Sequence, residues 1–551
     1  MATPLAPSPT TWFGASPLRH PRFRNFYIAS IMVALGYTMQ VTTAAWQMAT
    51  MTPSPLMVAL VQSASTAPTL LVGLVAGALA DIIQRRRIIL VTQVVLIAAT
   101  AALGATTLSG HLSPMGLLAL TFLIGAGFTF YMPAQQASIN DLVGRPEVPQ
   151  AVALGAVAFN MARAVGPALA GAIAAWFSPG SALLASAACF LMMLVVVRGW
   201  KLQLPALPGV PETLFSGIGS GVRFVRHSAS MRAIIIRNLT FSASASALWA
   251  LLPVIARDQL HLGAGGYGIL FGSFGAGAVA GALSIPKLLR KNSLQKIVVG
   301  AALLWVIASS IIAATNHVAV AVVGACLAGA SWVGVLASLS AGTQSAAPAW
   351  VRARAVAMNL LAVQASLAIG SVVWGIVASW TDTKVALIAS AIAMLVMLFV
   401  NRNVRVRLGR EADVTHEAQL PDLGIKVEPL PDDGPVLIQI EYRIDVANRP
   451  AFLAGIRKVE PTRRRNGASS WRVFRDLSED GRFVERYIID SWAEYVRLRR
   501  RMTMTDRQVQ EAVVQLQRAD TPIRVSRLLG VDLDESNLVV PVDGSPVVQR
   551  P

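Results

Sequence analysis

The strongest charge pattern in the apolar part of this sequence is one aspartate followed by three consecutive arginines. The segment runs from Gly77 through Asp81 to Arg85, Arg86 and Arg87. An acid at the end of one helix and a basic cluster at the start of the next can form a charge latch, which holds one conformation and must break for another. We expect these five residues to form such a latch. Simple anchoring of positive charge at a membrane surface would explain the arginines but not the aspartate.

A second pattern places an arginine just before a Gly-Pro pair, deep inside an apolar run. Gly166 and Gly171 permit close helix approach, and Pro167 bends a helix by removing one hydrogen bond. A kinked packing helix would use the same residues. Arg163 is different, because an unpaired arginine inside a span is costly. We expect it to face the interior, where it pairs with a substrate anion, backbone carbonyls or Asp141; the alternative is that it snorkels to the interface.

Several other apolar runs carry polar and aromatic side chains suited to an amphipathic ligand. Taken singly, each such residue is more often part of a helix–helix hydrogen bond or of the aromatic belt at a membrane interface than a ligand contact. The substrate-path candidates are Gln40, Trp46, Gln47, Tyr131, Gln135, Asn160, Asn238, Trp332 and Gln364. No spacing of Cys, His or acidic residues predicts a metal site, and no cofactor is expected.

The elements that must position these residues are membrane-spanning helices. The chain is 54% hydrophobic and 14% charged, with a mean hydropathy of +0.57, as in polytopic membrane proteins. A spanning helix needs about 20 mainly apolar residues. We expect twelve spans, at 26–50, 56–80, 87–108, 115–136, 150–176, 180–199, 233–255, 265–288, 294–314, 318–342, 353–379 and 384–401.

These spans form two related sets of six, because the sequence contains an internal repeat. Gly73 and Gly77 recur as Gly277 and Gly281, an offset of 204 residues (277 minus 73), and Gly166 and Gly171 recur as Gly370 and Gly375. Paired halves in a membrane protein commonly enclose a substrate path at their interface.

The positive charge lies between the apolar runs. The net charge is +18, and it is concentrated before residue 402. There, all basic residues except Arg163, Arg257 and Lys384 lie before the first span or near the even-numbered connections. This positive-inside pattern predicts that both termini are cytoplasmic, and it argues against nucleic acid as a partner.

The chain after the last span is soluble in character. Residues 436–442, 471–475, 482–489 and 523–528 read as strands, and 450–458 and 491–517 as helices. The order βαββαβ predicts a ferredoxin-like fold. We expect Trp471, Val473, Val484, Tyr487 and Ile489 to lie on one face of the sheet. Since two helices cover one face only, the other should pair with a second copy, forming a homodimer.

The loop from Gly77 to Arg87 resembles the signature of the major facilitator superfamily, although Ile82 and Gln84 replace its usual Arg and Gly. Ile285 stands at the second-half position equivalent to Asp81, so a latch would be one-sided. The Gly166-Pro167 motif resembles that of superfamily exporters. With its tail, the chain resembles the transmembrane secretion effector branch, near exporters of the enterobactin type. The resemblance implies a twelve-helix transporter in the plasma membrane that exports a small amphipathic molecule by alternating access.

The tail resembles the dimeric α+β barrel family, which includes antibiotic-biosynthesis monooxygenase-like domains. Trp492, after the third strand, fits that pattern. We expect a regulatory or dimerising module. A membrane-anchored enzyme with its active centre in the tail, and a receptor or scaffold that transports nothing, remain alternatives. The expected segments are a cytoplasmic tail (1–25), two six-helix bundles (26–199 and 233–401) joined by a cytoplasmic loop (200–232), a linker (402–433), the α+β domain (434–530) and a disordered end (531–551).

Overall fold

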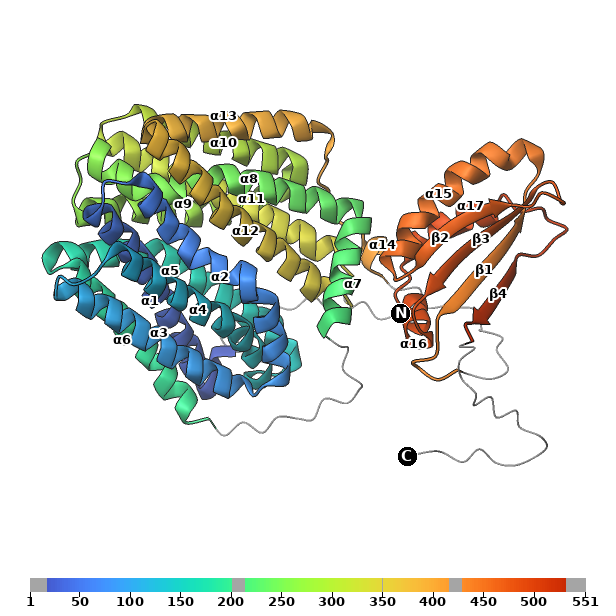
Figure 1. The fold of residues 1–551 in the computed structure, drawn as a ribbon, viewed down its shortest axis with the longest axis horizontal. Coiled ribbons are helices and arrows are strands. Elements are labelled where there is room, and N and C mark those ends of the chain that lie inside the picture. Colours follow the sequence, from blue (N-terminus) through green and yellow to red (C-terminus); the bar gives the residue numbers. More distant parts are fainter. Residues whose placement is uncertain (1–16, 201–213, 349, 416–428, 532–551) are drawn as a thin grey trace, which may run out of the picture. The chain divides into compact units, whose positions relative to one another are not determined.

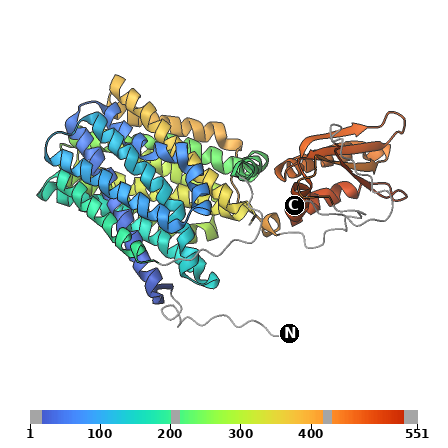
Figure 2. The same cartoon turned by 60° about the horizontal axis from the view of Figure 1, so that its bottom comes forward.

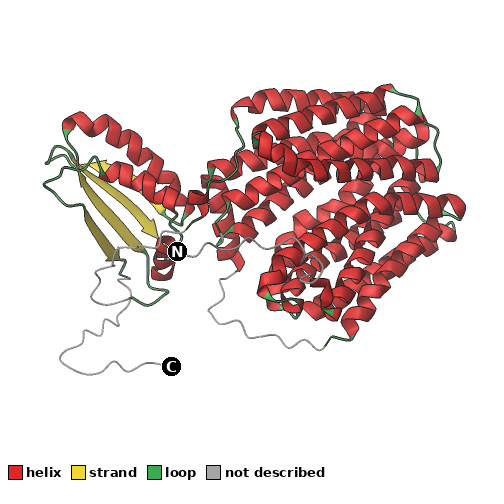
Figure 3. Ribbon diagram, turned by 180° about the vertical axis from the view of Figure 1, so that it is seen from behind, coloured by secondary structure: helices red, strands yellow, loops and turns green. Residues whose placement is uncertain are grey.

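The computed structural model describes residues 17–200, 214–348, 350–415 and 429–531. The end expected to be disordered lies outside these ranges except for Val531. The chain divides into two compact units. The first comprises Met1–Ile218, Ser230–Ala347 and Arg352–Gly409, and the second comprises Gly219–Ala229, Pro348–Val351 and Arg410–Pro551. Figure 3 shows helices throughout the first unit and a small sheet in the second.

Within the described ranges, twelve helices are long and apolar enough to cross a membrane, so the prediction of twelve spans is confirmed. Figure 2 shows them packed side by side. They are α1 (Pro21–Met51), α2 (Pro55–Ile82), α3 (Arg85–Leu108), α4 (Pro114–Leu142), α5 (Val148–Trp176), α6 (Pro179–Arg198), α8 (Ala229–Val254), α9 (Ala264–Lys291), α10 (Leu294–Ala314), α11 (Val318–Ala346), α12 (Arg352–Trp380) and α13 (Thr383–Val400).

Local sequence explains where several of these helices begin. α2, α4 and α6 each start with a proline, whose fixed backbone angle suits the first turn of a helix. The preceding residues Ser54, Ser113 and Ser178 each accept a hydrogen bond from a backbone amide of that turn. The short connections between spans therefore double as helix caps.

The first unit consists of two halves, α1–α6 and α8–α13, drawn blue to teal and green to orange in Figure 1. Its two ends differ. We call the end that carries residues 52–54 and 177–178 the short-loop face, and the opposite end, which carries residues 83–87 and 143–147, the basic-loop face. The halves meet mainly where α5 packs on α9 and α2 packs on α12.

Two helical features differ from the sequence-based expectation. The segment expected to form a central loop contains an amphipathic helix, α7 (Leu214–His227). The long helix expected at 491–517 is two helices, α16 (Trp492–Arg500) and α17 (Met504–Val514). The break occurs because Thr503 and Asp506 form a capping box that starts a new helix.

The tail forms the expected four-stranded antiparallel sheet, with strand order β2-β3-β1-β4. Its elements are β1 (Val436–Arg443), α15 (Arg449–Arg465), β2 (Ser469–Arg475), β3 (Arg482–Ile489), α16, α17 and β4 (Arg524–Leu529). This is the ferredoxin-like arrangement. Side chains from α15, α16 and α17 form one core with one face of the sheet. The other face, which we call the open face, is not covered by these helices.

The assignment of residues to the sheet faces was partly wrong. Tyr487 and Ile489 are buried under the helices, and Trp471 and Val473 pack against the same core. Val484 has the opposite parity on β3 and therefore lies on the open face. The error lies in the grouping of Val484, because side chains on a strand alternate between faces and Val484 is separated from Tyr487 and Ile489 by odd numbers of positions.

Candidate functional site

Arg163 lies in the middle of α5 and faces aromatic rings. Its guanidinium carbon is 5.5 Å from the ring centre of Phe159 and 5.6 Å from that of Trp249. Phe159 belongs to the same helix, but Trp249 belongs to α8 in the other half. The cation–π contact therefore joins the two halves. Among the residues that the structure describes, no carboxylate or carbonyl oxygen bonds this guanidinium.

Trp249 is part of a continuous aromatic cluster in the second half. Its ring centre lies 5.1 Å from that of Trp332 in α11 and 4.9 Å from that of Phe274 in α9. The cluster is defined here as Phe241, Trp249, Phe271, Phe274, Trp305 and Trp332, linked by ring contacts of 4.9–6.3 Å. Edge-to-face packing of this kind fixes the rings in place. The guanidinium of Arg163 lies over one member of the cluster.

The cluster continues across the interface toward the short-loop face. Phe271 contacts Tyr267, and Tyr267 stacks on Trp46 of α1 with ring centres 5.5 Å apart. The indole nitrogens of Trp249 and Trp332 are buried and have no hydrogen-bond partner among the described residues. Buried donors without partners are expensive unless a ligand can use them.

The glycines of α5 allow the helix to approach two partners. A β-carbon on Gly166 would lie 2.1 Å from the Thr38 hydroxyl oxygen of α1, and one on Gly171 would lie 2.6 Å from the Gly268 α-carbon of α9. Gly166 thus allows α5 to pack against α1 within the first half, and Gly171 allows α5 to pack against α9 of the second half. Pro167 lies between them, so the Gly-Pro motif holds α5 against both neighbours.

The other substrate-path candidates have separate surroundings. Gln40 is fully buried, and its amide has no partner among the described residues. Gln135 donates to the Ser30 hydroxyl at 3.3 Å, and Asn238 donates to Asn359. Tyr131 is buried next to Phe128. Gln47, Asn160 and Gln364 are partly buried.

Trp46 and Trp332 are therefore the predicted residues that share an aromatic array with Arg163. Sequence reasoning missed most of that array. Tyr267, Phe271 and Phe274 are spaced by four and three residues, which places them on one face of α9. That spacing could have identified them. Trp249 and Trp305 carry no comparable signal.

The basic cluster after α2 is engaged within the first half. Arg85 contacts the Asp141 carboxylate at 2.6 Å and the Ala137 carbonyl at 3.2 Å, both at the end of α4. Arg86 donates to the carbonyls of Val197 and Arg198 at the end of α6. Asp141 is thus bound by Arg85, not by Arg163. The side chain of Asp81 lies outside what the structure describes.

The tail domain contains a buried ionic network. The Glu485 carboxylate accepts hydrogen bonds from Arg463 Nε at 3.1 Å, Trp471 Nε1 at 2.9 Å and the Tyr442 hydroxyl at 3.0 Å. Burial opposes the charge on Arg463, but the Glu485 carboxylate outweighs it and holds the pKa of Arg463 above its ordinary value. Burial raises the pKa of Tyr487 to about 12. The carboxylate is fully enclosed by its own partners, as in a structural network.

Within the described ranges, no group of three or more His, Cys, Asp or Glu side chains could hold a metal ion. Two six-helix halves that meet around an arginine and aromatic rings define a transporter of the major facilitator class. A family model described as transmembrane secretion effector matches residues 12–534. The chain belongs to that family.

Relatives match over part of their length. The chain is 24% identical to the staphyloferrin A transporter of Staphylococcus aureus over 48% of this chain and 67% of that protein. It is 28% identical to the enterobactin exporter EntS of Shigella flexneri over 49% and 63%, respectively. It is 24% identical to the multidrug efflux pump Tap of Mycolicibacterium fortuitum over 38% and 54%. The match thus spans between about half and two thirds of the length of these relatives.

Solved structures share the fold. A bacterial homologue of the human lysosomal transporter Spinster superposes with a TM-score of 0.58 at 14% identity, covering 71% of this chain and 97% of that one. The nucleoside transporter NupG superposes with a TM-score of 0.55 at 14% identity, covering 70% and 98%. At these identities the likeness extends to the fold alone.

Proposed function

We propose that this protein is a secondary transporter that exports a small amphipathic molecule by alternating access. The observation that carries the proposal is the contact of Arg163 with Trp249, because it places a cation and aromatic rings from opposite halves at one point within the membrane. A guanidinium attracts an anionic group, and the rings offer an apolar or aromatic surface. We therefore propose an anionic or aromatic siderophore, drug or secondary metabolite as the substrate.

The contacts between the halves support alternating access. From the short-loop face inward, α5 and α9 pack closely at Gly171–Gly268 and again at Ala164–Gly275. Closer to the basic-loop face, Met161 is 54% exposed on α5, and Leu283 is 74% exposed on α9. We infer from the glycine contacts that the halves are closed at the short-loop face, and we propose that they diverge beyond Arg163. We assign this arrangement to the inward-facing state, with the basic-loop face and both termini in the cytoplasm.

Transport from cells tests this function directly. Deletion of the gene should raise the intracellular amount of the exported molecule, and the full chain should restore the normal amount. The variant Arg163→Ala should not restore it, although it is present in the membrane at a similar level. Equal restoration by the wild type and the variant would contradict the role given to Arg163, and no accumulation of any metabolite on deletion would contradict export.

We also propose that the tail (residues 434–530) is a dimerising or regulatory module with no enzymatic activity of its own. The buried Glu485 network supports a structural role, because each carboxylate oxygen already accepts a hydrogen bond from the domain itself. The second copy would cover the open face, where Leu437, Phe474, Val484, Ile488 and Leu528 lie. Catalytic turnover by the purified tail would favour the alternative of a membrane-anchored enzyme.

A further inference from the structure

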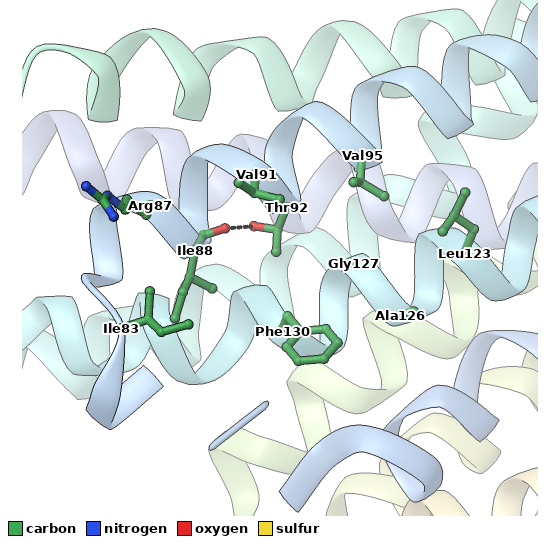
Figure 4. Close-up of a pocket in the computed structure, with 10 residues that line it drawn as sticks. All are labelled: Ile83, Arg87, Ile88, Val91, Thr92, Val95, Leu123, Ala126, Gly127 and Phe130. Atoms are coloured by element: carbon green, nitrogen blue, oxygen red, sulfur yellow. Dashed lines mark hydrogen bonds between the residues drawn. The ribbon is translucent and has the colours of Figure 1, made fainter. Parts of the chain in front are cut away.

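A groove of about 370 Å³ lies between the basic-loop half of α3 and the middle of α4, apart from the Arg163 site. Figure 4 shows Val91 and Val95 of α3 facing Leu123 and Phe130 of α4, with Arg87 at one end. The one polar side chain inside, Thr92, donates its hydroxyl to the Ile88 carbonyl at 2.8 Å. The groove wall is therefore apolar along its length, and the charge is confined to its mouth.

The three consecutive arginines differ in their partners. Arg85 is bound by Asp141, and Arg86 is bound by the last carbonyls of α6. Arg87 is exposed, and among the side chains that the structure describes none bonds its guanidinium. Among the described side chains, therefore, no anion competes for its charge at the point where the groove opens.

The dimensions of the groove match one leaflet of a bilayer. From Arg87 to Val95, α3 advances eight residues, or about 12 Å. Half of a hydrocarbon core is about 15 Å thick. Val91 is 64% exposed, so the groove is open along its side. An apolar chain attached to an anionic head would therefore lie in the groove with its head at Arg87.

We propose that this groove binds one anionic phospholipid, with the phosphate at Arg87 and an acyl chain between α3 and α4. Basic side chains at the cytoplasmic ends of spans attract anionic headgroups. The apolar wall binds the chain, and the arginine selects a charged head over a zwitterionic one. Because Arg85 and Arg86 connect the same loop to α4 and α6, a lipid at this position would support the geometry of the whole connection.

Photolabelling of the full-length protein in nanodiscs tests the site. The discs contain phosphatidylethanolamine and either phosphatidylglycerol or phosphatidylcholine with a photoactivatable acyl chain. We expect phosphatidylglycerol to label α3 and α4 more strongly than phosphatidylcholine. Arg87→Gln should lower the phosphatidylglycerol labelling about fivefold. The matched control is Arg290→Gln, because Arg290 is exposed at the basic-loop end of α9. This variant should leave the phosphatidylglycerol labelling unchanged.

A second pair of variants tests the groove itself. Val91→Trp should fill it and abolish labelling, whereas Val94→Trp, on the same helix and 52% exposed but not lining the groove, should not. The proposal would be overturned if phosphatidylglycerol and phosphatidylcholine labelled the protein equally and Arg87→Gln did not change the labelling. So would labelling that survives Val91→Trp, or labelling that a transported solute displaces, since the groove would then be an entrance for substrate.

Discussion

Gly171 of α5 and Gly268 of α9 are in such close backbone contact that neither position has room for a side chain. A β-carbon on Gly171 would come within 2.6 Å of the Gly268 α-carbon, and one on Gly268 within 2.7 Å of the Gly171 α-carbon. A related contact joins α12 and α2 across the same interface: a β-carbon on Gly375, which is equivalent to Gly171 in the repeat, would lie 2.7 Å from the β-carbon of Ala59. Two glycine-dependent seams thus close the short-loop face.

A side chain at this seam should open the face. In Gly171→Val the new atoms meet backbone that cannot yield, and overpacking of this kind costs about 1–3 kcal/mol. We expect the population to shift toward the state open at the short-loop face. The measurement is the reaction of Ser63→Cys with an impermeant maleimide added from that side, in a protein lacking Cys189 and Cys326. Ser63 is 8% exposed and donates to the Ala368 carbonyl across the other seam.

The matched control for this variant is Gly155→Val, on the same helix. No atom lies within 4 Å of a β-carbon placed at Gly155. The control should therefore react like the parent protein. If Gly171→Val also reacts like the parent, the close packing of α5 and α9 does not set the conformational equilibrium.

Much of the fold was predictable because its cause is local. Twelve apolar runs of sufficient length, the repeat at a fixed offset, and proline or serine at helix starts all appear in the sequence. The two features that were missed depend on competition between signals. The 491–517 helix has continuous helical character, and the Thr503–Asp506 capping box interrupts it. The α7 segment is amphipathic and too polar to be recognised by a search for spans.

The site was less predictable because it is built from distant segments. Arg163 was identifiable by the cost of a charge inside an apolar run. Its contact with Trp249 depends on how two halves pack, and single-sequence patterns do not encode that distance. The same reason explains Asp141, which was considered for Arg163 but is bound by Arg85. Charged residues at helix ends indicate that an ion pair forms, but the sequence does not indicate which two residues form it.

Arg163→Ala should reduce efflux far more than it reduces the amount of protein in the membrane. The cation–π contacts contribute about 0.5–2 kcal/mol, and the loss of a substrate partner adds to this. The comparison variant is Arg237→Ala, because Arg237 donates to the Asn401 and Val404 carbonyls and stabilises the end of α13. That variant should lower abundance and efflux together. A proportional loss in Arg163→Ala would assign this residue to folding.

Asp81→Asn tests the latch. If Asp81 attracts the arginine cluster, its neutralisation should change the balance of the two conformations and impair transport. Cysteine accessibility on both faces measures the balance. Asp141→Asn is the comparison, since it frees Arg85 of a partner at 2.6 Å without touching Asp81. Normal efflux and unchanged accessibility in Asp81→Asn would remove Asp81 from the mechanism.

Glu485→Gln should destabilise the tail domain by about 3–5 kcal/mol, because it leaves the buried charge of Arg463 without a counterion. Limited proteolysis of the full-length protein, followed through a C-terminal tag, measures the effect. Glu479→Gln serves as the control, since Glu479 is 42% exposed and pairs with Arg443 near the surface. Equal protease resistance of the two variants would mean that the network contributes little to stability.

The open face of the tail sheet provides the last test. Phe474 is 47% exposed there, and its pairing with Val484 places both on the side away from the helices. If a second copy covers this face, Phe474→Glu should convert a dimer of the full-length protein to a monomer, because a charge would be buried in an apolar contact. Leu477→Glu is the matched control. Leu477 is 91% exposed in the β2–β3 turn and outside the sheet. Sedimentation of the detergent-solubilised protein distinguishes the species. A wild-type chain that stays monomeric at high micromolar concentration would exclude the dimer, and the tail would then act on its own chain alone.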